Sequence, residues 1–255
     1  MRDLLKDKKI AVFGAGGLIG SAIVRGALAQ GASVIAVDLQ SEQLIEVLSE
    51  AGDDECQALS FAEVDACEER SVKGFFDSNA DLDGMVNAIY PRGKGYGAEF
   101  LEVNGQDFLA NVSLQVGSAF VIAQACAEYF KSRNEPFSLV NLASIYGSFT
   151  PRFNIYDGTA MTMPVEYAVA KAGMLQLSKY VAKYVGDTKF RVNCVSPGGV
   201  FDSQPKSFVE SYRKYSHGQG LLDADDIVGV CLFLLSDFSN RITGQDVKVD
   251  DGFSL

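Results

Sequence analysis

Two residues that could exchange a proton lie four positions apart, Tyr167 and Lys171 in the segment YAVAK. On a helix this spacing places both side chains on one face. A free phenol has a pKa of about 10, and a neighbouring ammonium favours the phenolate. A phenol tuned in this way can serve as general acid or base for an alcohol or a ketone.

A hydroxyl that could assist this pair is Ser144, which follows the apolar run 137–142. Tyr167 and Lys171 lie in the predicted helix 165–185, which leads into the apolar run 190–195. We expect the three side chains to meet at the carboxyl edge of a sheet, where open α/β sheets bind ligands. There Ser144 would hold a substrate oxygen through a hydrogen bond that strengthens as charge develops.

Composition excludes several other classes of function. The 255 residues carry 22 Lys and Arg against 33 Asp and Glu, a net charge of −11. This acidity disfavours nucleic-acid partners and anionic membrane surfaces. No apolar run approaches the ~20 residues of a membrane span, and the charged N-terminus lacks a secretory apolar region. We therefore expect a cytoplasmic protein without a membrane partner.

The histidine and cysteine content narrows the chemistry further. One histidine, His217, excludes a multi-histidine metal site and disfavours a Ser-His-Asp hydrolase, and we expect no metal. Five scattered cysteines without a CxxC pair indicate reduced thiols rather than a disulfide framework.

The elements that must position these residues alternate along the chain. Short apolar runs typical of buried parallel strands occupy residues 9–13, 33–37, 58–64, 84–87, 137–142, 190–195 and 247–249. Segments with helical spacing occupy residues 18–30, 42–51, 68–78, 106–131, 165–185 and 225–235. Alternation of strand and helix predicts an α/β fold with a doubly wound parallel sheet. No linker divides the chain, so we expect one domain over residues 1–255.

A glycine-rich turn follows the first predicted strand. Gly14, Gly17 and Gly20 let the backbone approach a pyrophosphate, and the helix N-terminus presents unpaired N–H groups to it. The alternative is a plain strand-to-helix turn.

An acidic residue ends each of the next two strands. Asp38, 18 residues beyond the last glycine of the turn, could accept hydrogen bonds from both ribose hydroxyls and would repel a 2′-phosphate. Leu39 and Gln40 follow it and offer no cation. This pattern favours NAD(H) over NADP(H), although Asp38 could instead cap a helix at Glu42. Asp65 could touch the adenine or cap a helix.

Taken together, the motifs resemble the short-chain dehydrogenase/reductase family in its single-domain form. They occur in the family's order over nearly the whole chain: Gly14–Gly20, Asp38, Asn87, Ser144, Tyr167–Lys171 and Ser196–Gly199. The resemblance implies a Rossmann-like, three-layer fold, a seven-stranded parallel sheet flanked by helices, and NAD(P)(H) dependence. It also implies an oxidoreductase acting on CH–OH groups.

The resemblance assigns roles residue by residue. Ser144 would orient the substrate, Tyr167 would transfer the proton, and Lys171 would tune Tyr167 and hold the nicotinamide ribose. Pro197 and Val200 would line the nicotinamide. The whole implied cofactor-binding set is Gly14, Gly16, Gly17, Leu18, Ile19, Gly20, Asp38, Leu39, Asp65, Ala66, Asn87, Ala88, Tyr167, Lys171, Pro197, Gly198 and Val200.

This chain departs from the family pattern at four places, and one of them is Asp202, which replaces the family's Thr after the Pro-Gly run and for which Ser203 could substitute. Leu18 stands where the family has glycine, and the NNAG run appears as residues 87–90, Asn-Ala-Ile-Tyr. The family's catalytic Asn, a member of a proton relay, aligns with Gln115, with Asn111 one turn earlier as an alternative. Glutamine can still bind a relay water.

The substrate region is longer than usual between Ser144 and Tyr167, which are 23 residues apart. The extra residues fall in 149–163, and we expect substrate loops at 90–100, 149–163 and 200–217. The candidate substrate residues are Tyr90, Arg92, Ser144, Arg152 and Tyr156. Arg92 and Arg152 could bind a phosphate or carboxylate, or could be ordinary surface charges. Residues 203–217 could form a mobile lid or a fixed surface helix.

Loops also narrow the resemblance. The segments VNAIYPRGKGYG, IYDGTAMTMPVEYAVAK and SPGGVFDSQP are similar to oxidoreductases of flagellin-modification and nonulosonic-acid sugar gene clusters. That similarity implies a sugar, a sugar phosphate or a nucleotide sugar as the small-molecule substrate.

Two predicted helices, 106–131 and 165–185, carry more apolar residues than one buried stripe requires. The surplus favours a homotetramer or homodimer interface, which the family often forms, over an unusually thick core.

Three functions therefore stay open. The leading one is an NAD-dependent oxidoreductase acting on a sugar-like alcohol or ketone. The second is a nucleotide-sugar epimerase or dehydratase with tightly held NAD. The third is a non-catalytic dinucleotide sensor, which the Ala88 and Gln115 departures suggest.

Overall fold

The structure is a computed structural model, which describes residues 3–40, 44 and 57–255. Within these residues, seven strands form one sheet in the order β3-β2-β1-β4-β5-β6-β7, and every neighbouring pair is parallel. The strands are β1 Lys9–Phe13, β2 Ser33–Asp38, β3 Leu59–Glu63, β4 Gly84–Asn87, β5 Phe137–Leu142, β6 Phe190–Pro197 and β7 Asp246–Val249. This order confirms the predicted doubly wound, Rossmann-like sheet.

The helices follow the predicted pattern closely. They are α1 Leu18–Ala29, α4 Glu69–Ser78, α5 Gly105–Arg133, α6 Val165–Val185, α7 Lys206–Arg213 and α8 Asp225–Leu235. Four short 3₁₀ turns, Phe100–Glu102, Ile145–Gly147, Phe153–Tyr156 and Asp237–Ser239, complete the described elements. The helix predicted at 42–51 lies outside the described residues, apart from Leu44.

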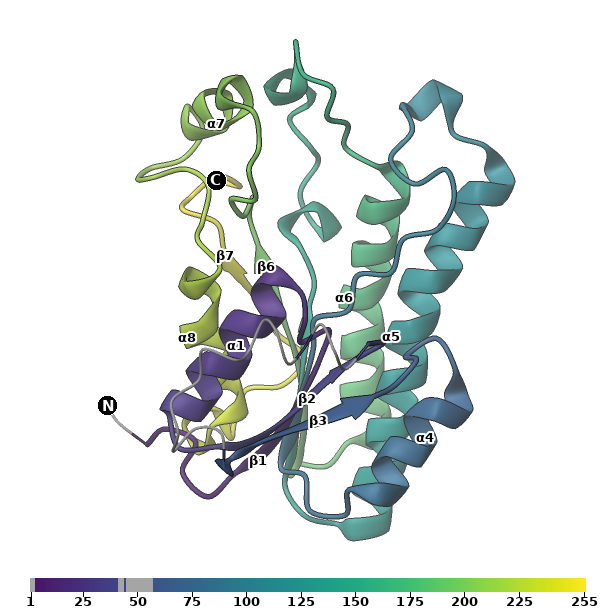
Figure 1. Cartoon of the computed structure of the whole chain (residues 1–255), viewed down its shortest axis with the longest axis vertical. Coiled ribbons are helices and arrows are strands. Elements are labelled where there is room, and N and C mark those ends of the chain that lie inside the picture. Colours follow the sequence, from purple (N-terminus) through teal and green to yellow (C-terminus); the bar gives the residue numbers. More distant parts are fainter. Residues whose placement is uncertain (1–2, 41–43, 45–56) are drawn as a thin grey trace.

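Helices cover both faces of the sheet (Figure 1). One core lies between the sheet and the pair α1 and α8, where Ile23, Val24 and Leu232 are buried. The other lies between the sheet and α4, α5 and α6, where Phe75 and Ile122 are buried. Strands β1, β4, β5 and β6 are buried almost throughout because helices shield both their faces, which explains their continuous apolar runs.

Helix α5 corrects one expectation from the sequence. Its length and hydropathy are sufficient for a membrane span, so the prediction that no apolar segment reaches that length was wrong. Its buried residues, among them Ile122, Cys126 and Phe130, pack into the core against the sheet. Packing against one face of the sheet therefore explains the length and apolar character of α5.

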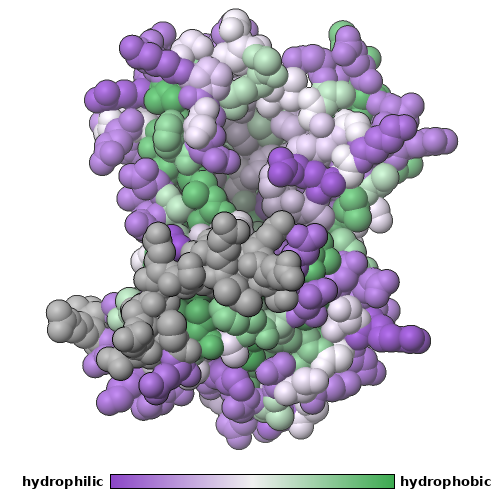
Figure 2. Space-filling view, in the orientation of Figure 1, coloured by the Kyte–Doolittle hydropathy of each residue, from purple (hydrophilic) through white to green (hydrophobic). Residues whose placement is uncertain are grey.

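The topology places a crevice at the carboxyl ends of β1 and β4. The connection after β1 leads to α1 on one face of the sheet, and the connection after β4 leads to α5 on the other face. The two connections therefore diverge and leave a crevice between them. Three long segments lie beyond that edge: residues 88–104, 143–164 and 198–224. They form the upper part of the molecule in Figure 1, and Figure 2 shows a hollow between the two sides of this upper part.

Candidate active site

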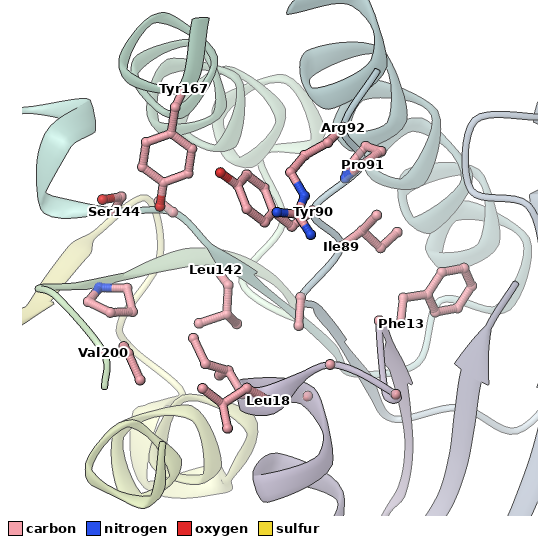
Figure 3. Close-up of a pocket in the computed structure, with 18 of the residues that line it drawn as sticks. Phe13, Leu18, Ile89, Tyr90, Pro91, Arg92, Leu142, Ser144, Tyr167 and Val200 are labelled. Atoms are coloured by element: carbon pink, nitrogen blue, oxygen red, sulfur yellow. The ribbon is translucent and has the colours of Figure 1, made fainter. Parts of the chain in front are cut away.

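A cavity of about 750 Å³ opens at the carboxyl edge of the sheet. It is lined by nineteen of the residues singled out from the sequence: Gly14, Gly16, Gly17, Leu18, Ile19, Gly20, Asp38, Leu39, Asp65, Ala66, Ala88, Tyr90, Arg92, Ser144, Tyr167, Lys171, Pro197, Gly198 and Val200. Figure 3 shows how ten of the lining residues face this space, from Leu18 on α1 to Tyr167 on α6.

Four predicted site residues lie outside the lining. Asn87 is buried, and its amide donates to Asn141 Oδ1 at 3.0 Å. Gln115 is buried on α5. Tyr156 lies one layer back, its hydroxyl 3.4 Å from that of the lining residue Tyr146.

The structure does not bring Arg152, the fourth, to the cavity. Its guanidinium carbon stands 4.6 Å from the ring centre of Tyr215, 5.2 Å from that of Phe149 and 5.7 Å from that of Phe253. Aromatic faces attract a cation in this arrangement. Arg152 therefore fastens the 149–163 segment to the C-terminal tail, and Arg92 is the predicted substrate cation that lines the cavity.

The glycine turn has the tight packing that a dinucleotide site requires. Gly14 has φ of +81°, and a Cβ added there would lie 2.7 Å from the Ala88 carbonyl oxygen. A Cβ on Gly20 would lie 2.0 Å from the Gly14 carbonyl oxygen. Helix α1 then begins without a side-chain cap and without an acidic residue in its first turn. Its N-terminal N–H groups and positive end are thus suited to a pyrophosphate.

Asp38 is held in place beside this turn. Its Oδ2 accepts from the Gly16 N–H at 2.9 Å, and its Oδ1 accepts from the Leu39 N–H at 2.8 Å. Each carboxylate oxygen can accept further hydrogen bonds. The two N–H groups therefore orient the Asp38 oxygens, and both oxygens can still accept hydrogen bonds from two hydroxyls. The helix that Asp38 might instead have capped, at Glu42, lies outside the described residues.

Asp65 does not cap a helix, whereas its contact with the adenine stays a prediction. Its Oδ1 accepts from the Cys67 N–H at 2.8 Å, and α4 begins later, with Glu68 at its N-cap position. Asp65 therefore shapes a turn at the cavity wall, where residues 64–67 line the space.

The proposed catalytic residues converge as expected. The Tyr167 hydroxyl points toward Ser144 in Figure 3. Lys171 Nζ stands 5.5 Å from the Tyr167 ring centre and donates to the Leu142 carbonyl oxygen at 2.6 Å. Ser144 begins a 3₁₀ turn, and its Oγ accepts from the Tyr146 N–H at 3.2 Å. The end of β5 and the first turns of α6 thus bring the three groups to one place.

Burial dominates the titration of this group in the protein without ligand. It raises the pKa of Tyr167 above the usual value, opposed by the hydrogen bond with Ser144. It also lowers the pKa of Lys171 to about 8. The sequence-based expectation that Lys171 brings the phenol toward neutral pH is therefore not met by the chain alone. A bound cationic nicotinamide is the further charge that would favour the phenolate.

Two tyrosines from the 90–97 segment adjoin this centre. The Tyr90 ring packs edge-on against Tyr167, with 5.4 Å between ring centres, and the Tyr90 and Tyr96 hydroxyls are hydrogen-bonded. The Gln115 side chain faces Tyr96, yet within the described residues neither of its amide atoms has a hydrogen-bond partner. Tyr96 lies in the predicted substrate loop 90–100, but the sequence analysis did not single it out, because no motif marks it.

Asn111, the alternative to Gln115, has another task. Its Oδ1 accepts from the Gly93 N–H at 2.7 Å, and its Nδ2 donates to the Lys94 and Asp107 carbonyl oxygens, both at 2.9 Å. The amide is thus used to anchor the 90–97 segment to α5.

The 203–217 segment contains the helix α7, Lys206–Arg213, and its contacts favour the fixed helix of the two predicted alternatives. The Tyr212 hydroxyl of α7 accepts from the Gly199 N–H at 2.7 Å, and its ring stacks on Phe253 with 4.0 Å between centres. Asp251 of the tail accepts from the Gly218 and Gly220 N–H groups, each at 2.9 Å. The C-terminal tail therefore holds α7 against the carboxyl edge of the sheet.

The fold and this cavity define a class of protein, an NAD(P)-dependent oxidoreductase that acts on hydroxyl or carbonyl groups. A family profile described as enoyl-(acyl carrier protein) reductase matches residues 14–254. The chain belongs to the short-chain dehydrogenase/reductase family.

Comparison with individual proteins agrees with that assignment. The chain is 34% identical to the post-translational flagellin modification protein A of Campylobacter coli, over 99% of this chain and 100% of that protein. It is 29% identical to a protein of Rhizobium meliloti named as a probable galactose dehydrogenase, over 97% and 95% of the two chains. A short-chain dehydrogenase of Leptospira borgpetersenii, solved with NAD⁺, is 27% identical, with a TM-score of 0.84 over 98% and 94%.

Proposed function

We propose that this protein transfers hydride between NAD(H) and a hydroxyl or ketone of a sugar-like substrate that carries an anionic group. The observation that carries the proposal is the convergence of Tyr167, Ser144 and Lys171 at a cavity that also contains the glycine turn and Asp38.

The chain's own residues supply the proton chemistry and the binding. Bound NAD(H) would accept or deliver the hydride. Tyr167 moves the proton at the substrate oxygen, and Ser144 donates a hydrogen bond to that oxygen as it gains charge. The Lys171 ammonium, held by the Leu142 carbonyl oxygen, favours the phenolate when the substrate is an alcohol.

The preference for NAD(H) rests on Asp38. Its two oxygens are oriented by the Gly16 and Leu39 N–H groups at the place where the sequence pattern puts the adenosine ribose. A carboxylate there repels a 2′-phosphate. Steady-state kinetics with both cofactors tests this point, and a higher kcat/KM with NADPH than with NADH would contradict it.

The substrate class rests on the outer wall of the cavity. Arg92 lines it and lies over the Tyr90 ring at 5.3 Å, so one exposed cation faces the space beside the reacting centre. A guanidinium of this kind suits a phosphate or carboxylate. One relative is named as a probable galactose dehydrogenase, and this name also favours a carbohydrate.

We also propose a homo-oligomer built on the outer faces of α5 and α6. Both helices leave large apolar side chains exposed: Leu109, Phe120, Val169, Tyr180 and Tyr184. Such a surface favours contact with a second copy. Measuring the mass in solution by light scattering tests it, and a monomer would contradict it.

We place the protein in the cytoplasm, since Cys67, Cys126, Cys194 and Cys231 are free thiols.

The decisive experiment is a panel of sugars, sugar phosphates and nucleotide sugars followed by NADH absorbance, with the Tyr167→Phe variant beside the wild type. Loss of the phenol should lower kcat at least about 100-fold. NADH affinity should stay within a few-fold as the control. Copurifying NAD with no net absorbance change would favour an epimerase or dehydratase. An unchanged biological function in Tyr167→Phe would favour a sensor.

A further inference from the structure

The 90–97 segment forms one wall of the cavity without regular secondary structure. Tyr90 and Arg92 line the cavity, and Gly95 and Gly97 have φ of +70° and +86°. A segment with such glycines has many conformations in the unfolded chain, so its ordering depends on contacts with neighbouring elements.

Three side chains from outside the segment supply those contacts. Asn111 of α5 holds its middle through Gly93 and Lys94, as described above. Its end is held at Gly97, where the N–H donates to Glu166 Oε1 at 2.9 Å and the carbonyl oxygen accepts from Thr162 Oγ1 at 2.6 Å. Both polar groups of the Gly97 backbone are therefore held by side chains, one in the first turn of α6 and one just before it.

Glu166 is an unusual choice for this position. Its side chain is only 1% exposed, and within the described residues it forms no salt bridge. Its Oε2 is also buried without a hydrogen-bond partner. A buried carboxyl group with so few partners is costly, so a specific interaction explains Glu166 at this position better than packing does.

The position of Glu166 in the chain supplies that role. It lies directly before Tyr167, and the segment it holds carries Tyr90, whose ring packs edge-on against the Tyr167 ring. Lys171 Nζ stands 5.9 Å from the Tyr90 ring centre, close to its 5.5 Å distance from Tyr167. One turn of α6 thus fixes both the catalytic phenol and the segment that places a second phenol beside it.

The second phenol is equipped to bind a hydroxyl. Tyr90 is 43% exposed and lines the cavity, while its hydroxyl is hydrogen-bonded to that of Tyr96 behind it. Tyr96 is in turn faced by the buried amide of Gln115. The hydrogen bond to Tyr96 fixes the Tyr90 hydroxyl, which then presents its remaining donor or acceptor capacity in one direction.

We propose that Glu166 is a positioning residue that holds the Tyr90–Tyr96 pair beside Tyr167 through Gly97, and that this pair binds a hydroxyl of the substrate next to the reacting carbon. The binding part rests on the proposed function, because it assumes a polyhydroxylated substrate. The positioning part concerns the chain alone and can be measured without a substrate.

Limited trypsin digestion of the full protein, without substrate, tests the positioning part. Arg92 and Lys94 are exposed cleavage sites inside the held segment. Glu166→Ala should be cut at these two residues at least about tenfold faster than wild type, because local opening exposes them. Glu166→Gln keeps an oxygen that accepts from Gly97 and should be cut at the wild-type rate. Mass spectrometry identifies the cut positions.

Thr162→Val and Thr162→Ser form an independent pair for the case in which Glu166→Ala fails to fold. Valine cannot donate to the Gly97 carbonyl oxygen and should accelerate cutting at Arg92 and Lys94, whereas serine should not. Equal cutting of wild type, Glu166→Ala and Thr162→Val would overturn the positioning role. Equal acceleration in Glu166→Gln and Glu166→Ala would overturn it as well, because it would assign the effect to the charge.

The binding part is tested with the best substrate from the sugar panel. Tyr96→Phe removes the partner hydroxyl and should raise KM for that sugar about 3- to 10-fold, the range for a lost hydrogen bond, with kcat within threefold. Glu166→Ala should raise the same KM, and Glu166→Gln should restore it. An unchanged KM in Tyr96→Phe would overturn the binding part. Failure of wild type to oxidise or reduce any sugar would refute the proposed function and leave the trypsin result standing.

Discussion

The two halves of the cavity are built in different ways. The cofactor half uses backbone: the turn after β1, the N-terminus of α1 and one carboxylate held by two N–H groups. The substrate half uses side chains from segments far apart in the chain, such as Asn111 holding Gly93 and Tyr212 stacking on Phe253.

This difference reflects what each half must recognise. A pyrophosphate is the same in every dinucleotide, so N–H groups and close approach of glycine suffice and depend little on the remaining side chains. A substrate wall is specific to one molecule, so its shape comes from particular side chains that other family members need not share. We therefore expect atoms added at the glycine turn to weaken cofactor binding. We expect the loss of side-chain contacts to loosen the substrate half.

Gly20→Ala gives the sharpest test of the cofactor half. The new Cβ would lie 2.0 Å from the Gly14 carbonyl oxygen, so the turn must move. Because the shifted turn misplaces the groups that bind the cofactor, we expect NADH affinity to fall at least about tenfold. This change corresponds to a loss of roughly 1.4 kcal/mol in binding free energy. Fluorescence titration with NADH measures it. Gly74→Ala in α4 is the matched control, since nothing lies within 4 Å of its Cβ, and it should leave affinity unchanged. Equal affinity in wild type and Gly20→Ala would contradict the close approach.

Lys171 lies where the two halves meet and should make stability depend on pH. Burial lowers its pKa to about 8, below that of an unfolded lysine near 10.4. Between these values the unfolded chain binds more protons, so the free energy of unfolding rises with pH in that window. Urea denaturation of wild type relative to Lys171→Met should show an increase of about 1–2 kcal/mol between pH 7.5 and 9.5. A difference that stays constant over this range would show that Lys171 is not desolvated.

Asp251→Ala gives the smallest expected effect and tests the substrate half. The change removes the acceptor for the Gly218 and Gly220 N–H groups and so loosens the segment after α7. We expect a loss of about 1 kcal/mol in the free energy of unfolding, with NADH affinity unchanged. Asp251→Asn retains an accepting oxygen and should lose less. Weaker NADH binding in Asp251→Ala would show that the two halves are coupled.

The predictability of each half from sequence follows the same division. The strands and the glycine turn were found because their signals are local: apolar runs, glycine spacing and a strand-end acid at Asp38. Contacts between distant segments determine the roles of Tyr96 and Glu166 and the packing of Arg152 against aromatic rings. Neither spacing nor composition marks such contacts. Arg152 looked like a substrate cation because charge is visible in a sequence, whereas the three rings that receive it come from three different segments. The helix α7 was left open because its buried residues, Phe208 and Tyr212, are too few for a clear period.

Phe253 is fully buried, and its ring stacks on Tyr212 of α7. The segment that covers the substrate space is therefore held by a residue that follows β7, whereas the glycine turn needs only β1 and α1. A change that displaces Phe253 would consequently disturb substrate selection before it disturbed dinucleotide binding.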